Sequence, residues 1–401
     1  MKINVKLGFK KDGRIRAKHI KVIADNGAYC AKAPAITGVA AMRHDTCYKY
    51  TDVKTEARLV YTNKVPTGAF RGFGNPSAEW AVEQAIDLGA HELGIDPIEI
   101  ARINAAETGY VSPHGNRVTS CELRQCLDMT EKMIDWKAKR ANKAPNTGFG
   151  LACTVHVSGK RHFGDYDGSS ATIKLNEDGK ALILSGEGEC GQGAHTAMCQ
   201  IAAEELGVRV EDVEISRADT DLTTFCLGAF ASRLTYVSGN AVKNAATSVK
   251  RQLFEQAAEM LEANPEDLMS RDGRVFVKGA EGKSVTVADV ARARLFRHNG
   301  APIVGSGSFD ADSVLPDSTR FGNESGAYNY GVQAAEVHVD PETGQVRVLN
   351  FVIASDCGTV IYPMGAEGQV EGGLAQGIGY ALTEGLQFDE GRPVNPNFSD
   401  Y

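Results

Sequence analysis

Four short segments of this 401-residue chain combine glycine with side chains that can bind a ligand. In the first, GEGECGQGAH, Gly186, Gly188 and Gly191 have the G-x-G-x-x-G spacing of a dinucleotide-binding turn. Glycines at the start of a helix leave backbone N–H groups at the positive end of the helix dipole, where an anion or an electron-rich oxygen can bind. Gln192 adds an amide that both donates and accepts hydrogen bonds.

A dinucleotide site needs more than this spacing. It requires a buried parallel strand before the turn and an acidic residue about 20 residues further on. The preceding strand belongs instead to a hairpin that turns at Asp178 and Gly179, and Asp219 comes later than the pattern requires. Two other interpretations stay open: the glycines let a strand pack on a helix, or they hold a different ligand.

The second segment, TGAFRGFGN, places a cation and two aromatic rings on a glycine-rich loop before a helix. Arg71, Phe70 and Phe73 in this setting are typical of a loop that faces a ligand. The alternative is that both rings belong to the core and that Arg71 pairs with a surface acid.

Two further segments are rich in small residues. LGAFASRLTYVSGNAV, which begins at Leu227, indicates either a ligand-facing loop or an ordinary helix start. GAEGQVEGGLAQGIGYAL has helical spacing although each glycine in a helix costs about 1 kcal/mol relative to alanine. Such a helix is expected to pack closely against backbone or a planar ligand. Its glycines include Gly368, Gly372, Gly373, Gly377 and Gly379.

Composition excludes several classes of protein. A net charge of −8 without a basic run argues against nucleic-acid binding, and no apolar stretch reaches the roughly 18 residues of a membrane span. The nine cysteines form no C-x-x-C pair, which argues against a zinc or iron–sulfur site in this chain and favours a reducing cytoplasm. G-x-S-x-G and H-E-x-x-H motifs are absent, and His156 and His162 do not have a metal-ligand spacing.

The elements that would carry these segments follow from turn and cap signals. Antiparallel hairpins are predicted around Asp12-Gly13, Asp178-Gly179 and Pro341 to Gly344. Helices are predicted at 75–94 with Asn75 as cap, at 97–104 with a capping box from Asp96 to Glu99, and at 120–136, 196–207, 239–261 and 368–382. The chain is therefore predicted to be α+β, with two domains, 1–143 and 144–401, that meet at a polar segment.

The segments GAFRGFG, GQGAHT, SRLTYVSGNA and GQVEGGLAQGIGYAL, in this order, resemble the molybdenum-cofactor subunit of the xanthine dehydrogenase and aldehyde oxidase family, the molybdenum hydroxylases. The resemblance covers essentially the whole chain, including DNGAY near its start. The version ASRLTYVSGNA is most similar to the branch that contains 4-hydroxybenzoyl-CoA reductase.

This resemblance implies a cofactor and its binding residues. The ligand would be molybdopterin, in its cytosine dinucleotide form, whose dithiolene sulfurs hold molybdenum without a metal ligand from the protein. Residues 1–143 would be the remainder of a first molybdopterin-binding domain, and 144–401 a second one that is incomplete at its C-terminus. Phe73 would face the substrate. The cofactor-binding residues would be Phe70, Arg71, Cys190, Gly191, Gln192, Ala231, Ser232 and Gln369.

The reaction implied is oxidation of an aromatic, N-heterocyclic or aldehyde carbon with oxygen from water. Electrons would pass to an iron–sulfur subunit and an FAD subunit in the cytoplasm. The 4-hydroxybenzoyl-CoA reductase branch implies reductive dehydroxylation of an acyl-CoA substrate as an alternative. A non-catalytic partner subunit or a relic with an empty cofactor groove is a second alternative.

Two departures from the family pattern affect these expectations. Members have an earlier GGGFGGK-like segment and a later active-site glutamate that acts as the general base, and the chain contains neither. No catalytic residue is therefore assigned, a further chain is expected to supply these segments, and the chain alone is expected to be inactive. Purine-specific members have an arginine where Val39 and Ala40 lie here, and Arg43 is closer to CYK than expected, so purine specificity is not predicted.

Overall fold

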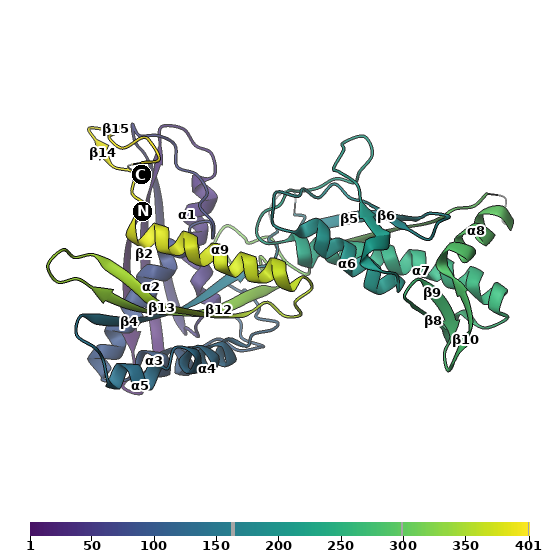
Figure 1. Cartoon of the computed structure of the whole chain (residues 1–401). Helices are drawn as coiled ribbons and strands as arrows, with labels where there is room; N and C mark the ends of the chain where they lie inside the picture. The colour runs from purple at the N-terminus through teal and green to yellow at the C-terminus, as the bar shows by residue number, and fades with distance from the viewer. Residues whose placement is uncertain (162–164, 298–299, 400) are drawn as a thin grey trace.

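The computed structural model describes residues 1–161, 165–297, 300–399 and 401. Two lobes lie side by side along the length of the molecule (Figure 1). Helices and strands are mixed in both lobes, and hairpins dominate the sheets, which confirms the α+β class.

The first lobe contains two three-stranded sheets. In one, β2 (Ile15–Gly27) lies between β1 (Lys2–Phe9), which is antiparallel to it, and β3 (Asp52–Tyr61), which is parallel. In the other, β12 (Tyr328–Val339) lies between β4 (Thr147–Val157) and β13 (Val346–Asp356), with both pairs antiparallel. The hairpins predicted at Asp12-Gly13 and at Pro341 to Gly344 are thus confirmed.

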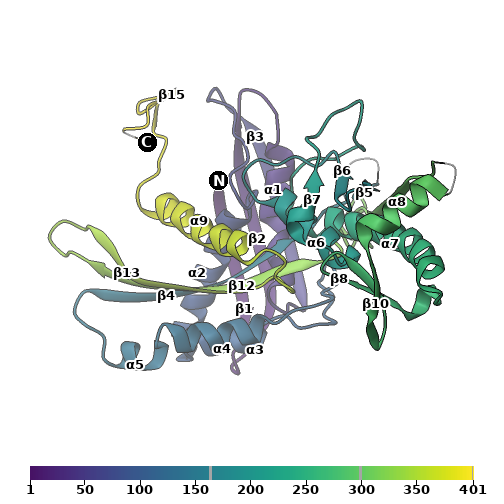
Figure 2. The ribbon, with the colours of Figure 1, turned by 45° about the vertical axis from the view of Figure 1, so that its right-hand side comes forward.

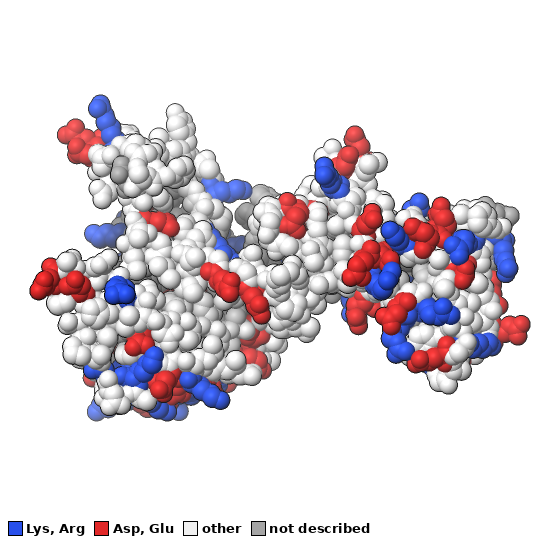
Figure 3. Space-filling model, in the orientation of Figure 1, with Lys and Arg blue, Asp and Glu red and all other residues white. Residues whose placement is uncertain are grey.

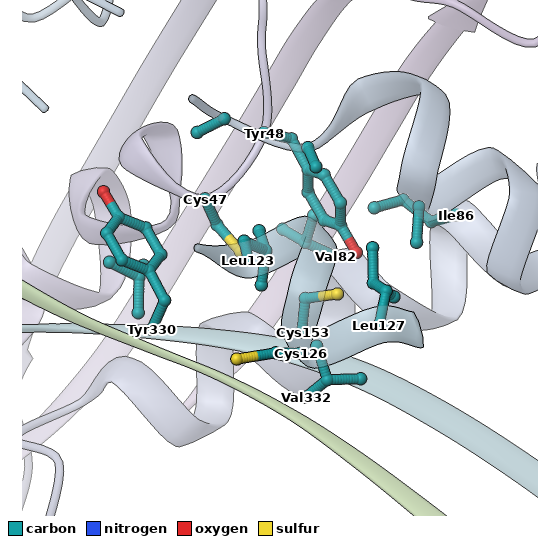
Figure 4. Packing of buried hydrophobic residues seen from close by; sticks show 14 of the residues in the cluster. Cys47, Tyr48, Val82, Ile86, Leu123, Cys126, Leu127, Cys153, Tyr330 and Val332 are labelled. Carbon is teal, nitrogen blue, oxygen red and sulfur yellow. The ribbon is translucent and has the colours of Figure 1, made fainter. Parts of the chain in front are cut away.

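Helices surround these sheets and share one core with them. Figure 4 shows part of this core, where Tyr48, Val82 and Leu127 pack beside the buried thiols of Cys47 and Cys153. The helices of this lobe are α1 (Ala33–Met42), η1 (Arg43–Thr46), α2 (Asn75–Leu93), α3 (Pro97–Asn104), α4 (Leu123–Met133), α5 (Trp136–Ala141) and α9 (Pro363–Leu382), and a short hairpin β14 (Phe388–Asp389) and β15 (Arg392–Pro393) follows α9.

The second lobe packs helices on a four-stranded sheet of order β11-β5-β6-β7. Its core lies between this sheet, α6 (Ala194–Leu206) and α7 (Gly239–Leu261). A smaller sheet, β10-β9-β8, and α8 (Val287–Arg297) form its far end (Figure 2). Its other elements are β5 (Gly168–Leu175), β6 (Ala181–Leu184), η2 (Val210–Asp212), β7 (Val213–Ile215), η3 (Leu234–Ser238), η4 (Pro265–Asp267), β8 (Leu268–Arg271), β9 (Arg274–Val277), β10 (Ala280–Thr286) and β11 (Ile303–Asp310).

The second lobe is inserted between two neighbouring strands of the first. Val157 at the end of β4 is paired with Tyr328 at the start of β12. Beyond them, Ser158 N donates to Ala327 O, and Arg161 N donates to Glu324 O. The two segments of the chain that connect the lobes therefore continue side by side. The first lobe therefore contains residues from both predicted domains. The predicted domain boundary between residues 143 and 144 stays a prediction.

Two details differ from the sequence predictions, at Asn75 and at β6, and one, at Asp96, agrees with them. Asn75 does not cap α2: Gly74 is the N-cap, and the Asn75 amide donates instead to Val155 O at 2.6 Å and to Glu79. Asp96 does cap α3, since its carboxylate accepts from Ile98 N. β6 is antiparallel to β5 at the predicted Asp178-Gly179 hairpin but also parallel to β7, so a strand–helix–strand unit is present that the sequence analysis missed.

Candidate functional site

The glycine turn before α6 is held by its own side chains. Gly191 and Gly193 have φ angles of 101° and 80°, a left-handed conformation that glycine adopts without steric cost. The Gln192 amide donates to Gly188 O at 2.9 Å and accepts from Cys190 N at 2.7 Å and from the Cys190 thiol at 3.0 Å. Cys190, Gly191 and Gln192 are therefore brought together in one compact turn.

Glu189 occupies the start of α6. Its carboxylate accepts from Gly191 N at 2.7 Å, and from Gly193 N and His195 N at 3.1 Å each. Burial raises the pKa of Glu189, but the three backbone donors outweigh it and lower the pKa from its ordinary value. Three of the N–H groups that the sequence analysis left available to an anion are thus already paired within the chain.

The loop of residues 67–74 meets α9, although almost 300 residues separate them in the sequence. Arg71 Nη2 donates to Gln369 O at 2.8 Å and to Gln369 Oε1 at 2.9 Å. The Phe70 ring lies 5.0 Å from the ring of Tyr380. Phe73 has φ 56° and is half-buried beside this contact region. Phe70, Arg71 and Gln369 are therefore neighbours, and Arg71 is bonded to an amide rather than to a surface acid.

Helix α9 is exposed or half-buried along its whole length. None of its residues is buried, and Met364, Tyr380 and Leu382 present apolar surface to solvent. Figure 3 shows that the face of the first lobe carrying α9 has few charged side chains, whereas charges gather on the second lobe. The close packing expected of its glycines is only partly present: Gly373 lies on the Arg71 guanidinium and Gly365 on Tyr362, while a Cβ at Gly368 or Gly377 would meet nothing within 4 Å.

Tyr362, the residue before α9, connects this helix to the glycine turn. Its ring lies 3.0 Å from the position that a Cβ on Gly193 would take. The Gln192 turn, Tyr362, Gln369 and Arg71 thus form one continuous run that begins in the second lobe and ends in the first.

Ala231 and Ser232 lie where the two lobes meet. Ala231 packs against the first core, whereas Leu234 belongs to the second. Ala231 O accepts from Gly159 N at 2.8 Å, and Ser232 is exposed. Both residues are left-handed, with φ 49° and 51°, a conformation that costs a non-glycine residue roughly 1–2 kcal/mol.

Other residues that the sequence analysis considered lie away from these loops. Arg43 is buried and forms an ion pair with Glu324 at 2.8 Å, so it is held in the interior. Burial, followed by the charge of Arg43, lowers the pKa of His156 to about 4. His162 lies outside the described residues. Among the residues that the structure describes, no group of three or more His, Cys, Asp or Glu side chains could hold a metal ion, and no helix could cross a membrane.

The sequence analysis missed the partners that fix these loops. These partners are Glu189, Tyr362 and the buried pair of Glu187 and Arg233. They lie beside the motif residues, but their spacing in the sequence does not show which residues they contact. Glu187 and Glu189 on either side of Gly188 were the available signal, since free N–H groups at a helix start are donors for a nearby carboxylate.

The exposed parts of these segments suit a flat polar ligand. Space is open beside Gly188, Gly191 and Gly368, where an added Cβ would meet no atom within 4 Å. The same segments carry the Arg71 guanidinium, the Ser232 hydroxyl and the amides of Gln192 and Gln369, groups that can bind the polar edge of a fused ring and a phosphate. Residues 186–193, 67–74, 226–232 and α9 together are called the loop site below.

Comparison with known proteins gives a consistent result for sequence and structure. A family model described as a molybdopterin cofactor-binding domain matches residues 129–401, and another with the same description matches residues 1–105. The putative xanthine dehydrogenase molybdenum-binding subunit XdhA of Escherichia coli is 34% identical, and the match covers all of this chain and 53% of that protein. The nicotine 6-hydroxylase large subunit of Paenarthrobacter nicotinovorans is 29% identical over all of this chain and 50% of its own length.

Solved structures agree with these relatives. Quinoline 2-oxidoreductase from Pseudomonas putida 86 superimposes with a TM-score of 0.87 at 30% identity, over 98% of this chain and 52% of that one. CO dehydrogenase from Oligotropha carboxidovorans superimposes with a TM-score of 0.86 at 26% identity, over 100% and 52%. The chain thus spans about half the length of the relatives that it matches.

Proposed function

Because this chain belongs to the molybdenum hydroxylase family of molybdopterin-binding subunits, we propose that its loop site holds molybdopterin, in the cytosine dinucleotide form, as part of a large catalytic subunit. One observation carries the proposal: the Gln192 turn, Tyr362, Gln369 and Arg71 form a continuous run from one lobe to the other. A ligand that spans both lobes would contact segments that are far apart in the sequence.

Each residue of the loop site has a distinct part in this proposal. Arg71 and Gln369, already bonded to each other, would offer a cation and an amide to the polar ring edge or the phosphate. Cys190, Gly191 and Gln192 would contribute exposed turn backbone and one amide, and Ala231 and Ser232 would contribute backbone and a hydroxyl. Phe70, packed on Tyr380, would hold the loop against α9, while Phe73 would face the substrate.

When bound, the cofactor supplies a dithiolene-held molybdenum centre that accepts the electrons removed from the substrate. The described residues orient the pterin and leave the metal without a protein ligand. We further propose that the complete enzyme oxidises an aromatic, N-heterocyclic or aldehyde carbon with oxygen from water, in the cytoplasm, and passes electrons to iron–sulfur and FAD subunits. The names of its relatives, which include a nicotine hydroxylase and a quinoline oxidoreductase, support oxidation of a ring carbon.

Cofactor content tests the proposal directly. Protein purified from its native host with any associated subunits is analysed for molybdenum by mass spectrometry, for pterin by fluorescence after oxidative release, and for released cytidine nucleotide. About one molybdenum per chain is expected. Absence of both metal and pterin would support a non-catalytic partner or relic and overturn the proposal.

Variants of the contact between Arg71 and Gln369 give the residue-level test. Gln369→Ala removes both the amide and one partner of Arg71, so retained pterin should fall by roughly tenfold, the effect of losing one or two hydrogen bonds to a charged group. Glu367→Ala, another exposed position of α9, is the matched control and should retain full pterin. The 401-residue chain by itself is expected to show no turnover with a dye acceptor.

A further inference from the structure

A buried carboxylate beneath the loop site collects hydrogen bonds from four directions. Glu187 is 1% exposed, and its Oε1 accepts from Ser169 Oγ at 2.7 Å and from Ser238 Oγ at 2.8 Å. Its Oε2 accepts from the Cys226 thiol at 2.8 Å. The fourth donor is Arg233 Nη1 at 3.3 Å. Glu187 itself belongs to the glycine turn, so this turn is bonded to β5, to the last residue of η3 and to the loop before η3.

Arg233 extends the same contacts to the entry of the second lobe. Its side chain is fully buried, with Nε donating to Asp167 Oδ1 at 3.1 Å and Nη2 donating to Gly168 O at 2.6 Å. A planar guanidinium has donors in several fixed directions, so one side chain can bind two carboxylates and a carbonyl together. A lysine ammonium is a single point charge, and it cannot bind three partners that lie in such different directions at once.

These bonds set the two loops relative to each other. Residues 226–232 are bonded at both ends, by the Cys226 thiol to Glu187 and through the Arg233 side chain that follows Ser232. One residue before the end of this segment, Ala231 O is bonded to Gly159 N, and a Cβ on Gly159 would lie 2.5 Å from Asp167 Oδ2. The two left-handed residues 231 and 232 are thus enclosed by contacts that keep them in a strained conformation.

A buried ion pair is weak evidence for stability alone, because desolvation of the two charges offsets their attraction. Its more specific effect is geometric, since each misplaced partner would leave a buried charge without its hydrogen bonds. Here the ion pair of Arg233 and Glu187 joins the two loops of the second lobe that carry Gln192 and Ser232. The pKa of the Cys226 thiol is raised to about 11 by burial and by its bond to Glu187, which keeps the thiol protonated as a donor.

We propose that Arg233 is a positioning residue that, through Glu187 and Asp167, holds loops 186–193 and 226–232 in a single relative arrangement. This inference rests on the proposed function only for the identity of the ligand that binds to the two loops. The coupling between the two loops is a property of the protein itself and can be measured without a cofactor.

The test compares Arg233→Lys with Arg161→Lys in the full chain. Arg161, at the crossing between the lobes, is also buried and also ion-paired, to Asp310 at 3.0 Å, but its side-chain partners are Asp165 and residues 310–313, which lie in neither loop. Hydrogen exchange of the cofactor-free protein is expected to quicken about tenfold in both loops of Arg233→Lys, since hydrogen bonds to a charged group are lost. Arg161→Lys should leave both loops unchanged.

Two further measurements separate positioning from folding and from the proposed function. Glu187→Gln, which keeps the side-chain size, should reproduce the loss of protection in both loops, and it replaces Arg233→Lys if that variant does not fold. In protein from the native host, Arg233→Lys should lower pterin content about tenfold and broaden the molybdenum(V) resonance signal. Unchanged exchange in both loops of a folded variant would overturn the inference; wild-type protein without pterin would overturn only the proposed function.

Discussion

The buried acid Glu79 contributes to the pH dependence of the stability of the first lobe. Its carboxyl group accepts from Val155 N at 3.0 Å and from the Asn75 amide at 2.9 Å. Burial raises the pKa of Glu79 to about 7, and these two hydrogen bonds only partly oppose the effect. Glu79 is therefore partly protonated in the folded state near neutral pH.

The sign of this pH dependence follows from linkage. Because the folded pKa exceeds the ordinary value of 4.5, the contribution of Glu79 is fully present below pH 4.5 and is lost as the pH rises through about 7. Relative to Glu79→Gln, the wild-type free energy of unfolding should fall by about 2–3 kcal/mol between pH 4.5 and pH 8. Denaturant titrations at several pH values measure this difference. Glu92→Gln, at an exposed position of the same helix, should show no such trend.

At the same scale, sequence reasoning identified the motif residues but not their partners. Arg71 and Gln369 were both selected from their motifs, and the structure bonds them to each other. Glu189 was not selected, although it fills the helix start that the glycines open. A carboxylate two residues before a glycine can point to solvent or back to the helix, and only the folded backbone decides which.

The elements themselves were predictable where turn chemistry is local. Asp-Gly pairs demand a left-handed residue, and Gly13 and Gly179 have φ 85° and 89° at the tips of the expected hairpins. The elements α1, β3, α8 and β11 were missed, because their positions depend on partners far along the chain. β3 pairs in parallel with β2, and β11 pairs with β5 across more than 100 residues, so no local pattern reveals either.

Helix α9 gives a prediction at the level of one element. Alanine at Gly368 and Gly377 would meet no atom within 4 Å, so the double variant should stabilise α9 by about 1 kcal/mol at each position through helix propensity. Hydrogen exchange of residues 363–382 in the 401-residue chain measures this gain. Gly365→Ala is the control with the opposite sign, because its new methyl group would overlap the Tyr362 ring. Faster exchange in the double variant would contradict the prediction.

At the scale of the whole molecule, the insertion of the second lobe could not be predicted from the sequence. Residues 137–148 are polar and contain proline and glycine, which made them a reasonable domain boundary. In the structure the next strand, β4, returns to the first lobe and pairs with β12, some 170 residues later. Antiparallel partners separated by a complete lobe leave no short-range signal.

This arrangement predicts that the first lobe folds without the second. Residues 1–161 and 324–401, joined by Asn-Gly, keep the Arg161–Glu324 and Ser158–Ala327 backbone bonds and would close β4 and β12 as a two-residue hairpin. The shortened chain should unfold cooperatively in denaturant, because its core draws almost entirely on first-lobe residues. Circular dichroism measures the unfolding transition, and the dispersion of the proton NMR signals shows whether the shortened chain is folded. The same shortened chain carrying Ser158→Pro, which removes the backbone N–H that donates to Ala327 O, is the control expected to be less stable.

The paired crossing of β4 and β12 also has a mechanical consequence. Two strands that leave one body side by side can act as a single pivot, and the contacts of Ala231 with the first core and of Tyr362 with Gly193 restrict rotation about it. Arg71 and Gln369 stand on one side of this pivot and Gln192 and Ser232 on the other. A rigid ligand that binds all four residues would hold the two lobes in one relative orientation. Release of the ligand would allow the lobes to rotate again.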